Sequence, residues 1–227
     1  MTSLASKLAQ NTVFGTLGVR DQAQLIQLSI SRNYDKDSWI VHDGEIWPYL
    51  LWVEYGTITI LKKSNEGRSL IVAMIGPGEI FWGMAFFLEN APMPVALTAH
   101  EPSQIHLWSR ERLLPILLRN GQMSWELSCL MVTRMERASE IVKELAFQPV
   151  QGRLARLLLD RYDASSESPV HRDLTLDEMA AHIGSTREMV CRALYRFSDD
   201  GLIQITRTEF LFTERGKLED LAQKEGR

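Results

Sequence analysis

The chain has 227 residues, of which 45% are hydrophobic and 24% are charged, and this composition is ordinary for a folded globular protein of one or two domains. Its formal net charge is −4, and the segment from Pro149 to the end carries 12 Lys and Arg against 14 Asp and Glu, a net charge of −2. No basic field therefore attracts nucleic acid, and any such contact would depend on a few well-placed Arg side chains.

Only two cysteines are present, Cys129 and Cys191, which excludes a disulfide framework and a multi-cysteine zinc or iron–sulfur site within one chain. Met1 to Gln10 lacks the basic and then apolar pattern of a secretion signal, and no run of about 18 apolar residues occurs. We expect a cytoplasmic protein that does not enter a membrane.

The first half of the chain shows short apolar or alternating runs, separated by glycine and proline turns such as Gly76-Pro77-Gly78. Short strands at such regular spacing predict an antiparallel barrel or jelly roll. The predicted strands are Trp39 to Val41, Tyr49 to Glu54, Thr57 to Leu61, Ser69 to Ile75, Phe81 to Phe86, Val95 to Ala99 and Gln104 to Leu107.

Beyond Ser109 the periodicity becomes helical, with one short helix and then a long one that Pro149 ends. The long helix carries a stripe at alternating steps of four and three, which is the spacing of a coiled-coil seam between two copies of the chain. Packing of this stripe on its own domain is the alternative. The stripe consists of Leu127, Met131, Arg134, Ala138, Ile141 and Leu145.

Two capping boxes lie close together, one from Thr175 to Glu178 and one from Ser185 to Glu188, and each predicts the start of a helix. Gly184 lies between them, where the first helix must end in a left-handed residue. The sequence therefore predicts a helix-turn-helix.

The second of these helices has a buried stripe, and its opposite face is polar and rich in arginine. Arg187, Glu188 and Arg192 lie near the start of the helix, and they are side chains that can read base edges in the major groove. A solvated face with a Glu188 to Arg192 ion pair is the alternative. We expect contacts to the DNA backbone from Thr175, Ser185, Thr186, Tyr195, Arg196 and Arg207.

The runs Leu202 to Thr206 and Glu209 to Thr213 predict a hairpin, the wing, with Arg207 in its turn. The segment from Leu174 to Ile203, with its Thr-Arg-Glu-x-Val-x-Arg core, resembles the DNA-binding motif of the Crp/Fnr regulator family. The resemblance extends over most of the chain and implies an α+β fold: an antiparallel jelly-roll barrel over residues 1–120 that senses an effector, a dimerisation helix over 121–147 and a winged helix-turn-helix over 148–227.

That resemblance also implies a homodimer on double-stranded DNA at a palindromic TGTGA-like operator, where Arg187, Glu188 and Arg192 contact bases. It further implies that the protein recruits or blocks RNA polymerase, and so acts as an activator or a repressor. An enzyme is not expected, because the sequence has no Gly-rich phosphate loop, metal-spaced His and Cys cluster or nucleophile elbow.

The barrel departs from the family's cyclic-nucleotide cassette, which carries a Gly-Glu pair and an Arg-Ser or Arg-Thr pair. The degenerate effector pocket is expected at Gly83, Met84, Pro94 and Val95, with Met84 in place of the Glu and Pro94 in place of the Arg. Without that Arg a buried cyclic phosphate lacks its charge-assisted partner, so cyclic AMP is not the expected effector.

Haem is an alternative effector group, because His42, His100 or His106 in the barrel can supply an axial ligand. Another small acid, a protein partner or no effector are the other readings. The rival to a DNA-binding regulator is a small-molecule or haem-based sensor, or a protein-interaction module, that binds DNA only weakly; the acidic charge balance favours it.

Overall fold

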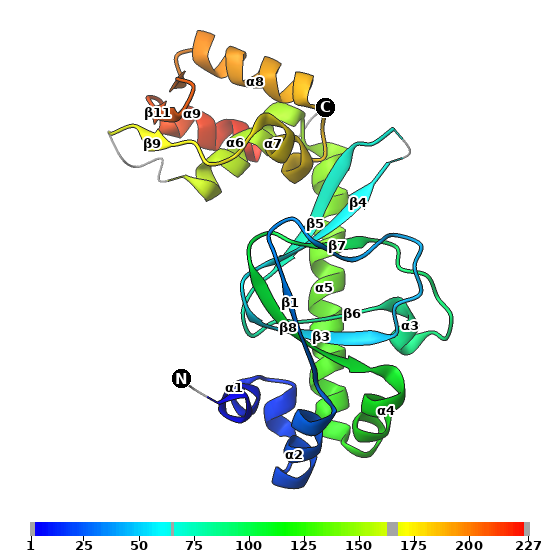
Figure 1. Cartoon of the computed structure of the whole chain (residues 1–227). Helices are drawn as coiled ribbons and strands as arrows, with labels where there is room; N and C mark the ends of the chain where they lie inside the picture. The colour runs from blue at the N-terminus through cyan, green and yellow to red at the C-terminus, as the bar shows by residue number, and fades with distance from the viewer. Residues whose placement is uncertain (1–2, 65, 163–167, 225–227) are drawn as a thin grey trace. The chain divides into compact units, whose positions relative to one another are not determined.

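A computed structural model describes residues 3–64, 66–162 and 168–224. The chain forms two compact units: the described residues of 1–62 and 72–137 belong to the first, and those of 63–71 and 138–227 belong to the second. The boundary falls inside one continuous helix, α5 (Gly121–Phe147), which therefore contributes to both units (Figure 1). The predicted division into three parts stays a prediction.

Two four-stranded antiparallel sheets form the predicted barrel, one in the order β1-β8-β3-β6 and the other in the order β2-β7-β4-β5. The fold is the predicted α+β jelly roll followed by a winged helix-turn-helix. The barrel strands are β1 Ile30–Tyr34, β2 Trp39–Val41, β3 Tyr49–Tyr55, β4 Ile58–Lys63, β5 Ser69–Ile75, β6 Ile80–Trp82, β7 Ala96–Ala99 and β8 Ser103–Ser109.

The alternation of side chains along β3 explains how the barrel is packed on both faces. Leu51 and Val53 belong to the apolar core between the two sheets, whereas Leu50 and Trp52 belong to a second core shared with the helices. Trp108 of β8 is fully buried in this second core, and its indole N–H donates to the carbonyl of Leu25 at 2.7 Å. The helices around this core are α1 Leu4–Gln10, η1 Phe14–Thr16, α2 Val19–Leu28, α3 Met84–Phe87 and α4 Arg110–Arg119.

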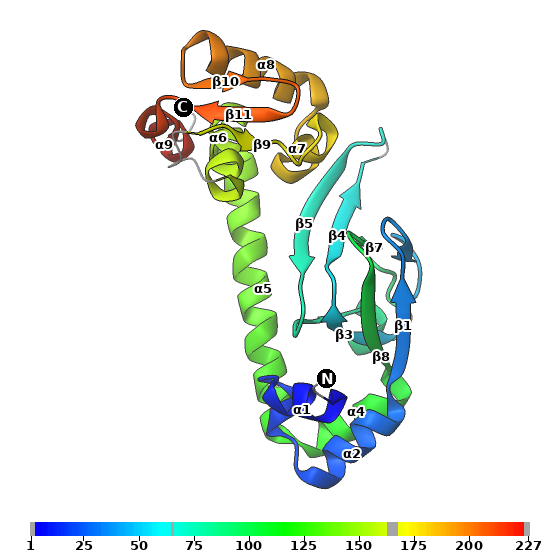
Figure 2. The same ribbon diagram turned by 60° about the vertical axis from the view of Figure 1, so that its left-hand side comes forward.

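The second unit has one apolar core, which the four helices that follow α5 share with a three-stranded sheet of order β10-β11-β9. Figure 2 shows the wing strands β10 and β11 alongside α8. The elements are α6 Val150–Arg161, β9 Val170–His171, α7 Leu176–Ile183, α8 Arg187–Asp199, β10 Ile203–Ile205, β11 Glu209–Phe212 and α9 Arg215–Gln223.

The helix α9 is held against α6 by contacts near its end. The carbonyl oxygen of Ala222 accepts hydrogen bonds from Gln148 Nε2 at 2.5 Å and from Arg156 Nη2 at 3.0 Å. Gly152 of α6 lies so close to the backbone of α9 that a Cβ atom there would be 2.8 Å from the carbonyl oxygen of Leu221. These contacts make α9 part of the second unit's core.

One predicted strand is wrong. The segment Phe81 to Phe86 is divided into the short strand β6 and the helical turn α3, with Gly83 between them. Gly83 packs against the backbone of Trp47, where a Cβ atom would lie 1.8 Å from the carbonyl oxygen, and the strand ends at this close approach. None of the described helices combines the length and the apolar character needed to cross a membrane.

Candidate nucleic-acid interface

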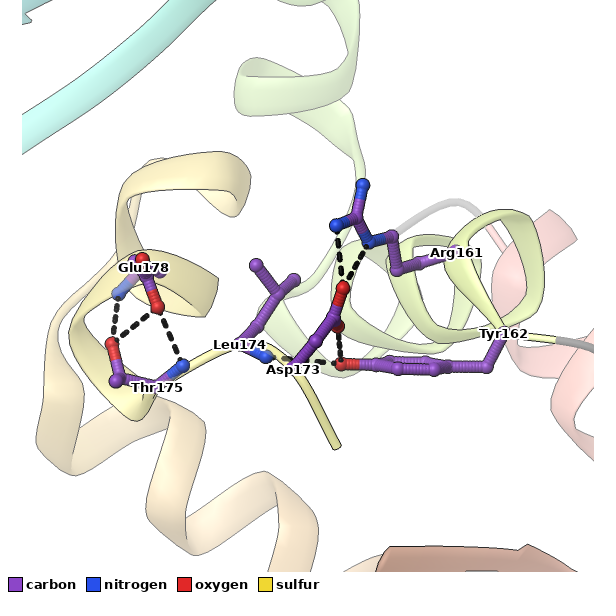
Figure 3. Close-up of polar contacts among 6 residues, drawn as sticks. All are labelled: Arg161, Tyr162, Asp173, Leu174, Thr175 and Glu178. Atoms are coloured by element: carbon purple, nitrogen blue, oxygen red, sulfur yellow. Dashed lines mark hydrogen bonds and ion pairs between the residues drawn. The ribbon is translucent and has the colours of Figure 1, made fainter. Parts of the chain in front are cut away.

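The predicted helix-turn-helix is formed by α7 and α8. The Thr175 hydroxyl accepts from the Glu178 amide at 3.2 Å, while the Glu178 carboxylate accepts from the Thr175 amide at 2.7 Å, so the first capping box is confirmed (Figure 3). Gly184 ends α7 with φ of +60°, the left-handed conformation that favours glycine. The tight turn that follows fixes the start of α8 relative to α7.

A polar cluster anchors the chain just before α7. Asp173 accepts hydrogen bonds from Arg161 at 2.5 Å and from the Tyr162 hydroxyl at 2.8 Å, and that hydroxyl accepts in turn from the Leu174 amide at 3.4 Å (Figure 3). The hydrogen bond from Arg161 lowers the pKa of Asp173. Burial and the hydrogen bond to Asp173 raise the pKa of Tyr162 to about 12. The cluster ties the end of α6 to the first helix of the motif.

The second capping box is corrected by one residue. The N-cap of α8 is Thr186, whose hydroxyl accepts from the Met189 amide at 3.3 Å, and Glu188 is the second residue of the helix instead of the third. The turn from Gly184 extends through Ser185, so the helix begins one residue later than predicted. The pKa of Glu188 is lowered by its own backbone amide and by the Thr186 hydroxyl, and it therefore carries a negative charge.

The two faces of α8 differ as the sequence predicts. Val190, Ala193, Leu194 and Phe197 are buried in the core of the second unit. The opposite face is solvent-exposed and bears the three predicted base-reading side chains together with two of the predicted backbone contacts: Arg187, Glu188, Arg192, Tyr195 and Arg196. The backbone of one rigid helix therefore brings these five residues together.

The two arginines predicted to read bases each have a contact within the motif. Arg187 Nη1 lies 2.8 Å from Asp177 Oδ2 of α7, and Arg192 Nη2 lies 2.9 Å from the sulfur of Met189. The pairing of Arg187 with Asp177 escapes sequence reasoning, because the two residues are ten positions apart and meet only through the turn.

The predicted backbone contacts differ in availability. The Thr175 hydroxyl donates to Glu178 at 2.8 Å and also accepts the cap bond, so it has no proton left for a phosphate; this prediction is corrected. The Thr186 hydroxyl is similarly used by its cap bond and by Glu188. Ser185 is half-buried at the turn, and Arg207 is exposed in the turn of the wing.

A groove between α8 and the first turn of α6 was not predicted from the sequence. The helix α6 begins after Pro149 without a side-chain cap, and its N-terminus carries the partial positive charge of the helix dipole. Two arginines and two aspartates line this groove, so its side chains carry no net formal charge, and an anion such as a DNA phosphate would bind at the end formed by the arginines and the first turn of α6. Its lining residues are Val150, Gln151, Met189, Arg192, Ala193, Tyr195, Arg196, Asp199 and Asp200.

The stripe of α5 that was predicted to form a seam with a second chain has two different environments along the helix. Leu127 is 2% exposed and Met131 is partly buried, both in the core of the first unit, and Arg134 pairs with Glu79 at 2.8 Å. The Leu127 side chain is therefore covered by its own domain, whereas Met131 and Arg134 contact that domain and remain partly exposed, so their place in the seam stays a prediction. The rest of the stripe lies on the C-terminal half of α5: Ala138 and Leu145 are exposed and Ile141 is half-buried.

A second stripe on α5 lies one residue further along and is exposed. The exposed fractions are 65% for Trp125, 51% for Val132, 66% for Met135 and 66% for Val142. These positions also follow heptad spacing, and large apolar side chains in a row on a surface mark an interaction site. Sequence periodicity alone does not separate the two stripes, because both follow heptad spacing and both are mainly apolar.

The predicted effector pocket is corrected in part. Met84 and Pro94 are exposed, whereas Gly83 is buried and Val95 is half-buried against the barrel core. Met93, 1% exposed, occupies the inward position that was assigned to Pro94, because neighbouring residues of an extended segment face opposite ways. Methionine carries no charge, so this inward position offers no cationic partner for a phosphate.

The three barrel histidines do not form a common site. His106 is buried, with Nε2 2.7 Å from Glu54 Oε2 and Nδ1 3.4 Å from Ser29 Oγ, so both of its ring nitrogens already have partners within the barrel. His42 is exposed and stacks on Trp39 at 4.6 Å between ring centroids. Within the residues that the structure describes, no group of three or more His, Cys, Asp or Glu is arranged to hold a metal ion.

A barrel joined through a long helix to a winged helix-turn-helix defines the class of DNA-binding transcription regulators with a sensor-like domain. Residues 31–120 match the family model of the cyclic nucleotide-binding domain, and residues 152–221 match that of the Crp-like helix-turn-helix domain. The chain belongs to the Crp/Fnr family of transcription regulators.

Curated relatives are regulators and not enzymes. The chain is 27% identical over 175 residues to the cAMP-activated global transcriptional regulator CRP of Pasteurella multocida, covering 75% of this chain and 83% of that one. It is 26% identical over 185 residues to the cAMP-activated global transcriptional regulator Vfr of Pseudomonas aeruginosa, covering 77% and 85%.

Solved structures share the fold. A transcriptional regulator of the Crp/Fnr family from Eubacterium rectale aligns with a TM-score of 0.78 at 20% identity, over 93% of this chain and 98% of that one. The c-di-GMP responsive global regulator CLP of Xanthomonas campestris aligns with a TM-score of 0.74 at 22% identity, over 86% and 100%.

Proposed function

We propose that this Crp/Fnr family regulator binds a palindromic, TGTGA-like operator as a homodimer in the cytoplasm and acts there on RNA polymerase. The observation that carries the proposal is the exposed start of α8, where Arg187, Glu188 and Arg192 project from a helix whose other face is buried. Arg can donate two hydrogen bonds to guanine, and Glu can accept one from cytosine.

Phosphate contacts would hold α8 in the groove. Arg196 and the first turn of α6 with Gln151 line one groove beside α8, while Arg207 lies in the exposed wing turn and Ser185 at the turn before α8. Backbone contacts fix the orientation of the protein without reading sequence. Because few cations are involved, we expect specificity to depend on this geometry more than on charge.

The exposed stripe of α5 supports the homodimer. Trp125, Val132, Met135 and Val142 would pair with the same residues of a second copy around a two-fold axis. Two recognition helices related in this way enter successive major grooves about 34 Å apart, which a palindromic site requires.

We propose that the activity of this regulator is set by an effector other than cyclic AMP or by none. The two curated relatives named above are cAMP-activated regulators. In this chain Met93 takes the position that faces the barrel core, and no arginine of the segment around Pro94 faces that core. An unpaired buried phosphate would lack its charge-assisted hydrogen bonds. Adding cyclic AMP should therefore leave DNA affinity unchanged, and a tenfold rise in affinity would refute this part of the proposal.

Fluorescence anisotropy with a labelled duplex tests the DNA-binding proposal. The wild-type chain should bind an inverted TGTGA-type repeat at least about tenfold more tightly than a scrambled duplex, and Arg192→Ala should weaken specific binding by roughly 1–3 kcal/mol. Arg215→Ala is the matched control. Arg215 is an exposed arginine of α9 that pairs with Glu219, so its replacement removes the same charge at a place away from α8. Equal affinity for both duplexes would contradict sequence-specific readout.

A further inference from the structure

The ion pair between Asp177 and Arg187 connects the two helices of the motif. Asp177 is the second residue of α7 and Arg187 is the first residue of α8, and Asp177 Oδ2 lies 2.8 Å from Arg187 Nη1. Both side chains are solvent-exposed, at 69% and 57%. An acidic side chain is unexpected beside a side chain that is proposed to meet DNA.

The backbone on both sides of the pair is fixed. The Thr175 to Glu178 capping box sets the first turn of α7, and Gly184 with the Thr186 cap sets the start of α8. The two Cα positions are therefore held by local structure, so the pair restricts the rotamers of the Arg187 side chain instead of moving its backbone.

The contact leaves Arg187 able to read a base. The ion pair uses Nη1, while a guanidinium has five N–H donors, so the edge formed by other donors is free for guanine O6 and N7. A carboxylate on one edge of the guanidinium and a base on another are compatible. In water such an exposed pair contributes little, but it strengthens when docking on DNA excludes water.

The same carboxylate opposes general DNA binding. A negative charge at the interface is repelled by the phosphates of any duplex, whatever its sequence. At a site with the correct guanine, the oriented Arg187 compensates for this repulsion, and at other sites it does not. Discrimination of this kind rests on a repulsive element as well as an attractive one.

We propose that Asp177 is a specificity-determining residue that orients Arg187 toward one guanine in each half-site and weakens binding to all other DNA. This inference rests on the proposed function, because it requires that α8 reads base pairs. Asp177 acts through Arg187 and is a positioning residue that makes no base contact of its own.

The test compares the wild-type chain with Asp177→Ala, Asp177→Glu, Arg187→Ala and the double variant, on duplexes in which each half-site position is changed in turn and on a scrambled duplex. Asp160→Ala is the matched control, because Asp160 is an exposed acid of α6 outside the groove beside α8, with no ion pair among the described residues. Thermal unfolding checks that all variants fold.

Asp177→Ala should bind the scrambled duplex a few-fold more tightly and lose discrimination about five- to tenfold at one position only, the position at which Arg187→Ala also loses it. Asp177→Glu should keep part of that discrimination, and Asp160→Ala should keep all of it. In the double variant the effects on discrimination should not add, because both changes remove one interaction.

Unchanged discrimination in Asp177→Ala, or an equal loss at every position, overturns the proposal for Asp177 while the proposed function stands. A wild-type chain that binds scrambled and palindromic duplexes equally overturns both. The two failures are therefore distinguishable by the wild-type measurement alone.

Discussion

Tyr162 illustrates how one side chain can hold a DNA-binding motif together. It is 7% exposed, packs edge-on against Phe210 of β11 at 5.4 Å between ring centroids, and donates to Asp173 just before α7. Its pKa is raised to about 12 by burial and by the hydrogen bond to Asp173. The folded state therefore favours the protonated hydroxyl.

Replacing Tyr162 by Phe should lower the free energy of unfolding by about 1–3 kcal/mol at pH 7, because a hydrogen bond to a charged partner is lost. A raised pKa in the folded state means that this contribution is present below the unfolded value of about 10 and is lost as the pH rises toward 12. Urea unfolding at pH 7 and pH 11.5 should show the difference between wild type and Tyr162→Phe shrinking at the higher pH. A difference independent of pH would show that packing, not the hydroxyl, accounts for the loss.

Arg207 in the wing turn should behave differently from the base-reading arginines. Arg207→Ala should weaken binding to operator and scrambled duplexes by the same factor, and should reduce the slope of log affinity against log salt by about 1, since it removes one phosphate contact. Anisotropy titrations over a NaCl series measure both quantities. A loss confined to the operator would mean that Arg207 reads bases.

At this scale, local sequence rules found most of the motif but not its contacts. The Thr175 box and the left-handed Gly184 depend on neighbours within three or four residues, so they could be predicted. The true cap Thr186 differs from the predicted Ser185 because the length of the turn is set by how α7 and α8 pack. The pairing of Asp177 with Arg187 needs the completed fold.

Among the elements, the turn between α7 and α8 gives a direct test of backbone geometry. Gly184→Ala should destabilise the DNA-binding unit by about 1–2 kcal/mol, because φ of +60° is strained for a residue with a Cβ atom. Gly216→Ala is the control, since Gly216 lies in α9 with open space around it and alanine is the better helix former. Thermal denaturation should show a loss for the first variant and none for the second.

Along α5, the exposed stripe can be tested with a cysteine that the chain already has. Cys129 is exposed and lies four residues after Trp125 and three before Val132, on the same face of the helix. In a parallel pair of helices it should lie close to the same residue of the other chain. Mild oxidation should therefore give a covalent dimer that Cys129→Ser abolishes and Cys191→Ser retains, on a non-reducing gel. A cross-link that requires Cys191 would place the interface elsewhere.

The barrel strands show which elements local sequence patterns can predict and which they cannot. Strands with a continuous apolar run, such as β2 and β5, have the predicted bounds, whereas β1 with its polar sequence Ile-Ser-Arg-Asn-Tyr was not predicted. It is a strand because it pairs with β8 from Ile30 to Tyr34, a contact between distant parts of the chain. The two-residue strand β9 likewise exists only through its pairing with β11. Long-range pairing of this kind leaves no local signal.

For the whole molecule, the proposed dimer can be tested at the exposed stripe of α5. Met135→Glu should convert the proposed dimer to monomers and reduce affinity for the palindromic duplex at least about tenfold, because a charge would be buried at the seam. Leu118→Glu is the matched control, since Leu118 is an exposed leucine of α4 outside the stripe. Sedimentation velocity measures the mass, and an unchanged mass for Met135→Glu would exclude this face as the interface.

The order of domains was accessible from sequence because a single specific motif, the segment from Leu174 to Ile203, identified the family. The face of α5 open to a second chain was not accessible, because Leu127 and Val132 are equally apolar and only the position of the barrel core separates them. The residue that faces the barrel core was predicted to be Pro94 and is Met93. In an extended segment, a shift of one residue changes which side chains face the core.

The attachment of α9 to Gln148 and to α6 has a practical consequence for the truncation of this protein. The carbonyl oxygen of Ala222 accepts hydrogen bonds from the side chains of Gln148 and Arg156. A DNA-binding fragment that ends at Leu218 would therefore leave the buried side-chain amide of Gln148 without its hydrogen-bond partner. We expect such a fragment to aggregate when it is produced alone.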